Sequence, residues 1–184
     1  MLYVIRHGLT DWNKEYKLQG QTDIPLNEEG RKMAEEASKE FKGLNFDVVF
    51  SSPLKRARET AQILVGDLDI PIIYDDRLKE MNFGIYEGTQ ECFKIPNCPI
   101  TVFFKNPEKY EGVEGGESMD DLLNRTEDFL EDKVYPLLKA GKNVLIVGHG
   151  AMNSSIVTNF YHWPRERFWE LGIPNCQFLK LEQS

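Results

Sequence analysis

Histidine is scarce in this chain, and two of its three copies directly follow apolar runs that have the composition of buried strands. His7 follows the run at 2–6, and His149 follows the run at 143–148. In an open parallel sheet, the ligand crevice lies at the carboxyl ends of the strands. We therefore expect both imidazoles to reach one cleft if these two strands are neighbours.

Two arginines belong to the same predicted edge of the sheet. Arg6 ends the first apolar run, and Arg56 lies in the first turn of the helix that follows a third run at 47–51. Guanidinium groups bind phosphate oxygens bidentately and are permanently charged, so arginines beside imidazoles predict a pocket for a phosphate dianion. If the phosphoryl group is transferred rather than only bound, an imidazole can act as the nucleophile and form a phosphohistidine.

Cleavage of a phosphomonoester also needs a group that protonates the alkoxide leaving group. Carboxylates that follow the predicted strand at 71–75 are the candidates, and spacing alone leaves Asp75, Asp76 and Glu80 open. A helix that begins near Ala151 would in addition point its N-terminal amides at a bound anion.

The elements that must position these groups alternate between strands and helices. Helical patterns run from 27 to about 41, with Gly43 as the stop, and from 119 to about 138. An alternating run at 176–181 predicts an edge strand. Runs typical of buried strands lie at 2–6, 47–51, 71–75 and 143–149. This alternation is typical of an α/β sandwich.

The stretch from 89 to 116 interrupts the alternation. It contains several prolines and glycines with aromatic residues between them. Loops of this length inside a compact domain tend to be lids or binding loops. Because 184 residues correspond to about one domain, we expect a single domain over 1–184, with an insertion at about 89–116 that shapes the substrate pocket.

The composition narrows the class of partner. There are 22 Lys and Arg against 30 Asp and Glu, and the resulting net charge of −8 gives no counterion-release affinity for nucleic acid. The apolar runs are far shorter than the roughly 20 residues of a membrane span, and no signal-peptide pattern follows Met1. We expect a cytoplasmic protein with no nucleic-acid or membrane partner, whose three cysteines are free thiols without a metal.

Several longer strings surround these residues. They are LYVIRHGLTDWN from 2, LQG from 18, PLNEEG from 25, SSPLKRARETA from 51, LKEMNFGIYEG from 78, GGES from 115 and VGHG from 147. As an ordered set, they resemble the histidine phosphatase superfamily in its phosphoglycerate mutase-like branch. The resemblance implies a three-layer α/β/α sandwich with a mostly parallel six-stranded sheet, and neither metal nor other cofactor.

The resemblance also implies a role for each matching residue. His7 is the phosphorylated nucleophile, and Glu80 is the proton donor in preference to the two aspartates. The phosphoryl group is bound by Arg6, Arg56 and His149, and further contacts to phosphate or substrate come from Asn13, Gln19 and Gly20.

Within this family, the sequence favours a phosphatase that releases inorganic phosphate from a small phosphorylated metabolite. Mutases of the branch typically place Arg after the catalytic Glu and Asn after Gly-His-Gly, whereas this chain has Met81 and Ala151. The alternatives are a cofactor-dependent phosphoglycerate mutase and a non-catalytic phosphoester-binding module. The sequence leaves the natural substrate open among sugar phosphates, phosphoglycerates, nucleotides and α-ribazole phosphate.

Overall fold

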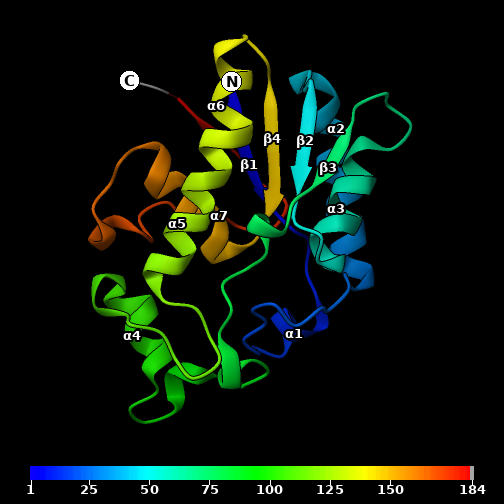
Figure 1. Ribbon diagram of the computed structural model, residues 1–184. Helices are drawn as coiled ribbons and strands as arrows, with labels where there is room; N and C mark the ends of the chain where they lie inside the picture. The colour runs from blue at the N-terminus through cyan, green and yellow to red at the C-terminus, as the bar shows by residue number, and fades with distance from the viewer. Residues whose placement is uncertain (183–184) are drawn as a thin grey trace.

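The computed structural model describes residues 1–182, and these form five strands in one sheet with the order β3-β2-β4-β1-β5 (Figure 1). The strands are β1 (Leu2–Arg6), β2 (Val48–Ser51), β3 (Ile72–Tyr74), β4 (Val144–Gly148) and β5 (Phe178–Leu181). β5 runs antiparallel to β1, and all other pairs are parallel. The mostly parallel sheet and the C-terminal edge strand are thus confirmed.

The expectation of six strands was wrong for the described residues, which form five. β3 is an edge strand of three residues, two of which are exposed. The chain that follows it forms short 3-10 turns and loops instead of pairing with that edge. The strand count implied by the family resemblance therefore exceeded the count that the apolar runs themselves supported.

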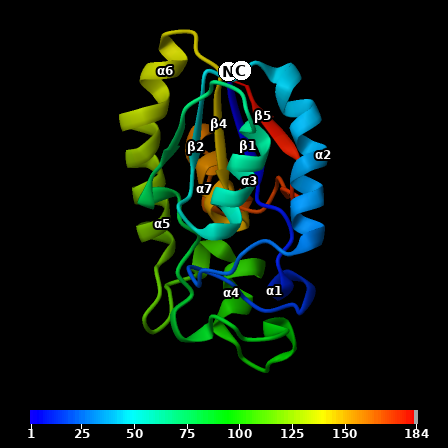
Figure 2. The ribbon, with the colours of Figure 1, turned by 90° about the vertical axis from the view of Figure 1, so that its right-hand side faces the viewer.

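The central strands are buried because helices cover both faces of the sheet (Figure 2). One face packs against α2 (Glu28–Leu44) and α3 (Lys55–Val65), and the other against α5 (Met119–Phe129), α6 (Tyr135–Lys139) and α7 (Gly150–Phe160). Burial on both faces explains why β4 is a continuous apolar run instead of an alternating one. The three-layer sandwich is confirmed.

One predicted helix ends later than expected, and another contains an irregular turn. α2 continues through Gly43 to Leu44 and ends where Asn45 adopts a left-handed conformation with φ of 52°. Asn is one of the few non-glycine residues that tolerate this conformation, so it replaces the predicted glycine stop. The helix expected over 119–138 contains a π-helical turn at Leu130–Val134, just before Pro136, which has no amide hydrogen to donate.

The segment 89–116 lies below the sheet in Figure 1, on the same side of the molecule as α1 (Asp11–Lys14). It consists of short 3-10 turns and α4 (Pro99–Lys105). Phe103 of α4 is fully buried in a separate small core with Phe83 and Phe168. The segment is therefore a folded cap, and it shares a small apolar core with residues outside it.

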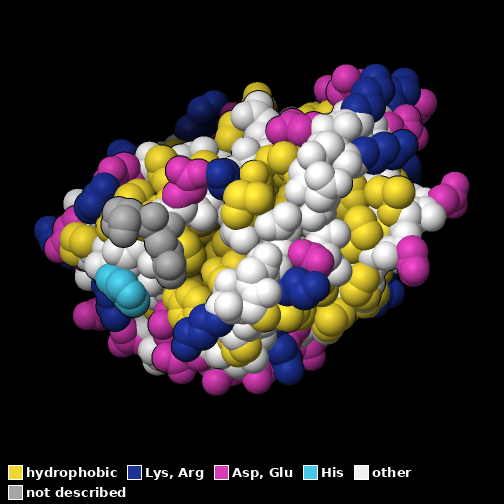
Figure 3. All heavy atoms as spheres, turned by 90° about the horizontal axis from the view of Figure 1, so that it is seen from above, with side chains coloured by type: hydrophobic (Ala, Val, Ile, Leu, Met, Phe, Trp, Pro, Cys, Tyr) yellow, Lys and Arg dark blue, Asp and Glu magenta, His cyan; other side chains and the backbone are white. Residues whose placement is uncertain are grey.

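The opposite end of the molecule, seen in Figure 3, carries acidic and basic side chains that are interspersed. This face therefore has no broad surface of a single charge sign. Within residues 1–182, the longest helices are too short or too polar to cross a lipid bilayer.

Candidate active site

A cavity of about 180 Å³ lies at the carboxyl ends of the central strands, and we call it the strand-end cavity. Its walls include most of the residues that the sequence singled out: Arg6, His7, Asn13, Gln19, Gly20, Arg56 and Glu80. His149 is the exception, because its side chain is fully buried beside His7, with the two ring centroids 5.2 Å apart. The structure thus brings together in space residues that are up to 143 positions apart, Arg6 and His149.

His7 directly follows β1, and its backbone amide continues the ladder by donating to the carbonyl of Gly148 at 3.0 Å. Its ring is almost completely buried, and Nδ1 lies 2.6 Å from the carbonyl oxygen of Gly8. A carbonyl oxygen can only accept a hydrogen bond, so we assign the ring proton to Nδ1. Nε2 then carries the lone pair that a nucleophilic imidazole needs.

The local electrostatics keep both imidazoles neutral. Burial, with the positive charges of Arg56 and Arg6, holds the pKa of His7 well below its ordinary value of 6.5. The pKa of His149 is lowered in the same direction, first by burial and then by Arg56 and His7. At neutral pH, the positive charge of this site therefore comes from the arginines.

His149 is tied to the end of β2. Its Nε2 lies 2.8 Å from the hydroxyl oxygen of Ser52, which follows β2 directly. The other ring nitrogen, Nδ1, is buried and has no hydrogen-bond partner among the described residues.

Arg56 is almost completely buried, and its guanidinium binds the loop that carries Gly20. Nη1 donates to the carbonyl of Thr22 at 2.8 Å, and Nη2 donates to the carbonyl of Gly20 at 2.5 Å. Burial lowers its pKa to about 10, so Arg56 remains charged at neutral pH. The Nε atoms of both Arg56 and Arg6 are buried without a partner. Unpartnered donors of this kind are costly, and an anion in the cavity is the natural acceptor for such groups.

Of the three candidate carboxylates, only Glu80 lines the cavity. Asp75 forms an ion pair with Arg77 at 2.7 Å, and Asp76 pairs with Lys79 at 3.6 Å on the surface. Glu80 is thus the only one of the three carboxylates that the structure places at the cavity, and its role as proton donor stays a prediction.

The carboxylate of Glu80 is bound by the N-terminus of α7. Oε2 accepts from the amide of Ala151 at 3.1 Å, and Oε1 accepts from the amides of Met152 and Met81 at 2.8 Å each. The sequence had predicted that amides of this helix would face a bound anion. In the structure, Glu80 takes two of them, which fixes the carboxylate through the favourable end of the helix dipole.

A second layer of contacts holds the backbone of Glu80, and sequence reasoning missed it. Arg125 and Gln21 each donate to the Glu80 carbonyl at 3.1 Å. Arg125 also pairs with Glu117 at 2.7 Å, and Glu117 accepts from the amide of Asn82 at 2.8 Å. The GGES string that contains Glu117 was the only available signal, and it did not identify the partner.

Asn13 and Gln19 both interact with Thr10. The Thr10 hydroxyl donates to the side-chain oxygens of Gln19 at 2.8 Å and Asn13 at 3.1 Å, and with Asn13 it forms the capping box of α1. Gly20 has φ of 55°, and a Cβ at this position would overlap the carboxylate of Glu87. The predicted ligand contacts of these residues remain a prediction.

Glu87 is another residue that the sequence did not single out. Its carboxylate accepts from the backbone amides of Gln21 at 3.1 Å, Thr22 at 2.7 Å and Phe83 at 3.0 Å. It therefore joins the loop that contains Gly20 to the chain that follows Glu80.

No set of three or more His, Cys, Asp or Glu side chains within 1–182 is arranged as a metal site, and independence from metal remains a prediction.

Comparison with known proteins adds a family match and two relatives of similar sequence. The model of the histidine phosphatase superfamily (branch 1) matches residues 2–184. The uncharacterized phosphatase PhoE of Bacillus subtilis is 36% identical over 157 residues, which cover 84% of this chain and 74% of that protein. A 2,3-bisphosphoglycerate-dependent phosphoglycerate mutase of Gloeobacter violaceus is 31% identical over 96% of this chain and 82% of its own length.

A solved structure extends the similarity to three dimensions. The phosphoserine phosphatase of Entamoeba histolytica, in complex with 3-phosphoglyceric acid, superposes with a TM-score of 0.81 at 30% identity. The match covers 96% of this chain and 87% of that one.

Proposed function

Because the chain belongs to the histidine phosphatase superfamily (branch 1), we propose that it hydrolyses small phosphomonoesters through a phosphohistidine on His7. The observation that carries the proposal is the state of His7. Its pKa is held well below the ordinary value by burial and by the arginines, its Nδ1 is hydrogen-bonded to a carbonyl oxygen, and it lines a cavity with buried arginine donors. A lone pair next to a preformed anion site is what an imidazole nucleophile for phosphoryl transfer requires.

In the first step, Nε2 of His7 attacks phosphorus, and the bond from phosphorus to the leaving oxygen breaks. Arg6, Arg56 and His149 stabilise the charge on the phosphoryl oxygens. Glu80 donates a proton to the leaving oxygen, and the three amides that bind its oxygens stabilise the carboxylate that remains.

In the second step, water attacks the phosphohistidine. Glu80, now ionised, accepts a proton from that water, and inorganic phosphate leaves with His7 restored. Asn13, Gln19 and Gly20 would contact the phosphate or the adjoining part of the substrate. In this proposal the chain acts as a single domain over 1–184, and the insertion at about 89–116 shapes the pocket for the leaving group.

A mutase is the second candidate, and similarity to the Gloeobacter protein favours it. A mutase must bind a second anionic group of its substrate in addition to the transferred phosphoryl group. Besides Arg6 and Arg56, Lys17 lines the strand-end cavity, but its ammonium already pairs with Glu15 at 2.5 Å. The scarcity of further cations supports the phosphatase.

The test is turnover of p-nitrophenyl phosphate with and without EDTA, combined with rapid quenching. We expect steady release of inorganic phosphate that survives EDTA, and an acid-labile, base-stable phosphoenzyme that is absent in His7→Ala. Vanadate should inhibit competitively. A fully active His7→Ala enzyme would overturn the mechanism, activity restored only by magnesium would indicate a metalloenzyme, and vanadate binding without turnover would indicate a binding module.

A further inference from the structure

A second and larger cavity, of about 390 Å³, adjoins the strand-end cavity. Asn13, Lys17, Leu18 and Phe104 line both cavities, so the two are neighbours with shared walls. We call it the aromatic cavity. A group esterified to a phosphate in the strand-end cavity can therefore extend into it.

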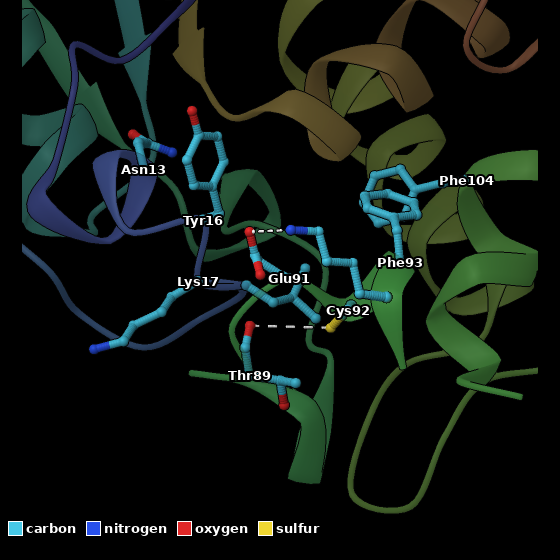
Figure 4. Close-up of a pocket in the computed structure, with 10 residues that line it drawn as sticks. Asn13, Tyr16, Lys17, Thr89, Glu91, Cys92, Phe93 and Phe104 are labelled. Carbon is cyan, nitrogen blue, oxygen red and sulfur yellow. Dashed lines mark hydrogen bonds and ion pairs between the residues drawn. The ribbon is translucent and has the colours of Figure 1, made fainter. Parts of the chain in front are cut away.

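The walls of the aromatic cavity are mainly apolar. Phe93 and Phe104 meet edge to face with their ring centroids 5.1 Å apart. Figure 4 shows this pair on one side of the cavity and Tyr16 on the other. Phe93 is 58% exposed and Tyr16 is 73% exposed. Large aromatic side chains exposed together beside a reactive site are typical of a binding surface.

The charged side chains around this cavity are already paired. Glu91 forms an ion pair with Lys94 at 2.8 Å. Lys17 pairs with Glu15 at 2.5 Å, and Figure 4 shows its side chain extending away from the other lining residues. The cavity therefore has mainly apolar walls, and its charged side chains form ion pairs. Its described residues include no unpaired cation that could bind a carboxylate or a second phosphate.

From this arrangement we propose that the aromatic cavity binds the leaving group and selects phosphomonoesters of bulky, apolar, uncharged alcohols or phenols. The inference rests on the proposed phosphatase function and adds a substrate class to it. Phosphoserine and phosphoglycerate, in contrast, would bring a carboxylate into a cavity where it has no unpaired cation. Phe93 is the specificity-determining residue, because it is the exposed aromatic ring contributed by the segment 89–94.

A series of n-alkyl phosphates tests the proposal, because their leaving groups have nearly equal acidity and differ only in apolar length. Each buried methylene contributes about 0.8 kcal/mol, which corresponds to roughly fourfold in kcat/KM. We expect kcat/KM to rise about fifteenfold from butyl to hexyl phosphate, which differ by two methylenes, and 3-phosphoglycerate to be a poorer substrate than either. A flat series, or a preference for 3-phosphoglycerate, would overturn the inference.

The variant Phe93→Ala tests whether the rise of kcat/KM with chain length comes from the aromatic cavity. Phe93 is mostly exposed, so its replacement should leave the fold intact. We expect the gain from butyl to hexyl phosphate to shrink to about twofold, with a smaller loss of kcat/KM for ethyl phosphate than for hexyl phosphate. Phe93→Leu should retain most of the gain. The matched control is Leu68→Ala, an exposed apolar residue in the loop between α3 and β3, which should leave the series unchanged.

A second variant tests the balance of charge. Glu91→Gln removes the partner of Lys94 and leaves a cation at the cavity. We expect kcat/KM for 3-phosphoglycerate to rise a few-fold, with hexyl phosphate unchanged. An equal change for both substrates would contradict the role assigned to the ion pair.

Failure of this inference can be distinguished from failure of the proposed function. If ethyl and p-nitrophenyl phosphate are hydrolysed but chain length and Phe93 have no effect, only the substrate class is wrong. If neither is hydrolysed and no phosphoenzyme forms, the phosphatase function is wrong, and the substrate class fails with it.

Discussion

At the residue scale, burial keeps the imidazole of His7 in the form that the proposed mechanism needs. Desolvation favours the neutral imidazole, and the arginines that would bind phosphate lower the pKa of His7 further in the unliganded site. The hydrogen bond to the Gly8 carbonyl then decides which nitrogen carries the proton. In the proposed mechanism, the arginines thus both help to keep the nucleophile neutral and supply the positive charge that attracts the phosphate.

Glu80 provides the sharpest mechanistic prediction at this scale. If Glu80 protonates the leaving oxygen, Glu80→Gln should slow hydrolysis of alkyl phosphates by about 100-fold or more, within the usual range of general acid catalysis. p-Nitrophenyl phosphate should lose less, because its leaving group needs little protonation. The measurement is the ratio of kcat values for ethyl and p-nitrophenyl phosphate in the two enzymes.

Asp75→Asn is the matched control for Glu80→Gln, because Asp75 is a nearby carboxylate that pairs with Arg77 outside the cavity. We expect this control to leave the ratio of the two substrates unchanged. Equal losses for both substrates in Glu80→Gln would mean that Glu80 positions the phosphoryl group or acts mainly in dephosphorylation.

The residues of the site could be predicted to different extents. Spacing after strands singled out His7, His149 and the arginines, because these side chains carry an evident chemistry, and their roles stay predictions. The choice of Glu80 depended on the family resemblance until the structure placed Asp75 in an ion pair. Arg125 could not be predicted, because it acts on the backbone carbonyl of Glu80 and its residue type occurs on any solvated helix.

At the element scale, the loop that carries His7 is held by a close approach between two glycines. A Cβ at Gly8 would overlap the carbonyl oxygen of Gly30, and a Cβ at Gly30 would overlap the backbone of Leu9. The first turn of α2 therefore packs directly against the backbone that follows the nucleophile. The PLNEEG string contains Gly30, but only the structure shows why a glycine is required there.

Two substitutions in α2 test this contact. Gly30→Ala should destabilise the protein by about 1–3 kcal/mol through overpacking, and it should lower activity by displacing the loop next to His7. Gly43→Ala, in the same helix, meets open space and should stabilise by about 0.5–1 kcal/mol with activity unchanged. Urea unfolding and p-nitrophenyl phosphate turnover measure both effects. A neutral Gly30→Ala would show that the backbone relaxes freely at this contact.

At the scale of the whole molecule, the layers and the position of the insertion could be predicted, but the internal structure of the cap could not. Strands buried on both faces and amphipathic helices have strong local patterns, so the sandwich followed from the sequence. The segment 89–116 has short turns and prolines without a period, and its order depends on contacts that are distant in sequence, such as those of Phe103 with Phe83 and Phe168. The sixth strand was expected from the resemblance, although no apolar run supported it.

The buried histidines also affect the stability of the whole molecule. His7 and His149 have pKa values well below 6.5 in the folded protein, whereas an unfolded chain binds the proton near pH 6.5. As pH falls below 6.5, the unfolded state therefore takes up protons that the folded state does not, and the free energy of unfolding decreases. This contribution is complete above pH 6.5 and is lost progressively as pH falls toward the lowered pKa values.

We expect wild-type stability to fall more steeply than that of His7→Asn, by about 1 kcal/mol per pH unit between about pH 6 and 5. The difference between the two slopes cancels the contribution of the carboxylates that both proteins share. Urea unfolding at several pH values measures this difference. The buffers must contain no phosphate, because a bound anion would favour the protonated imidazole. Equal slopes would show that His7 titrates in the folded protein near its ordinary pKa, so that neither burial nor the arginines keep the nucleophile neutral.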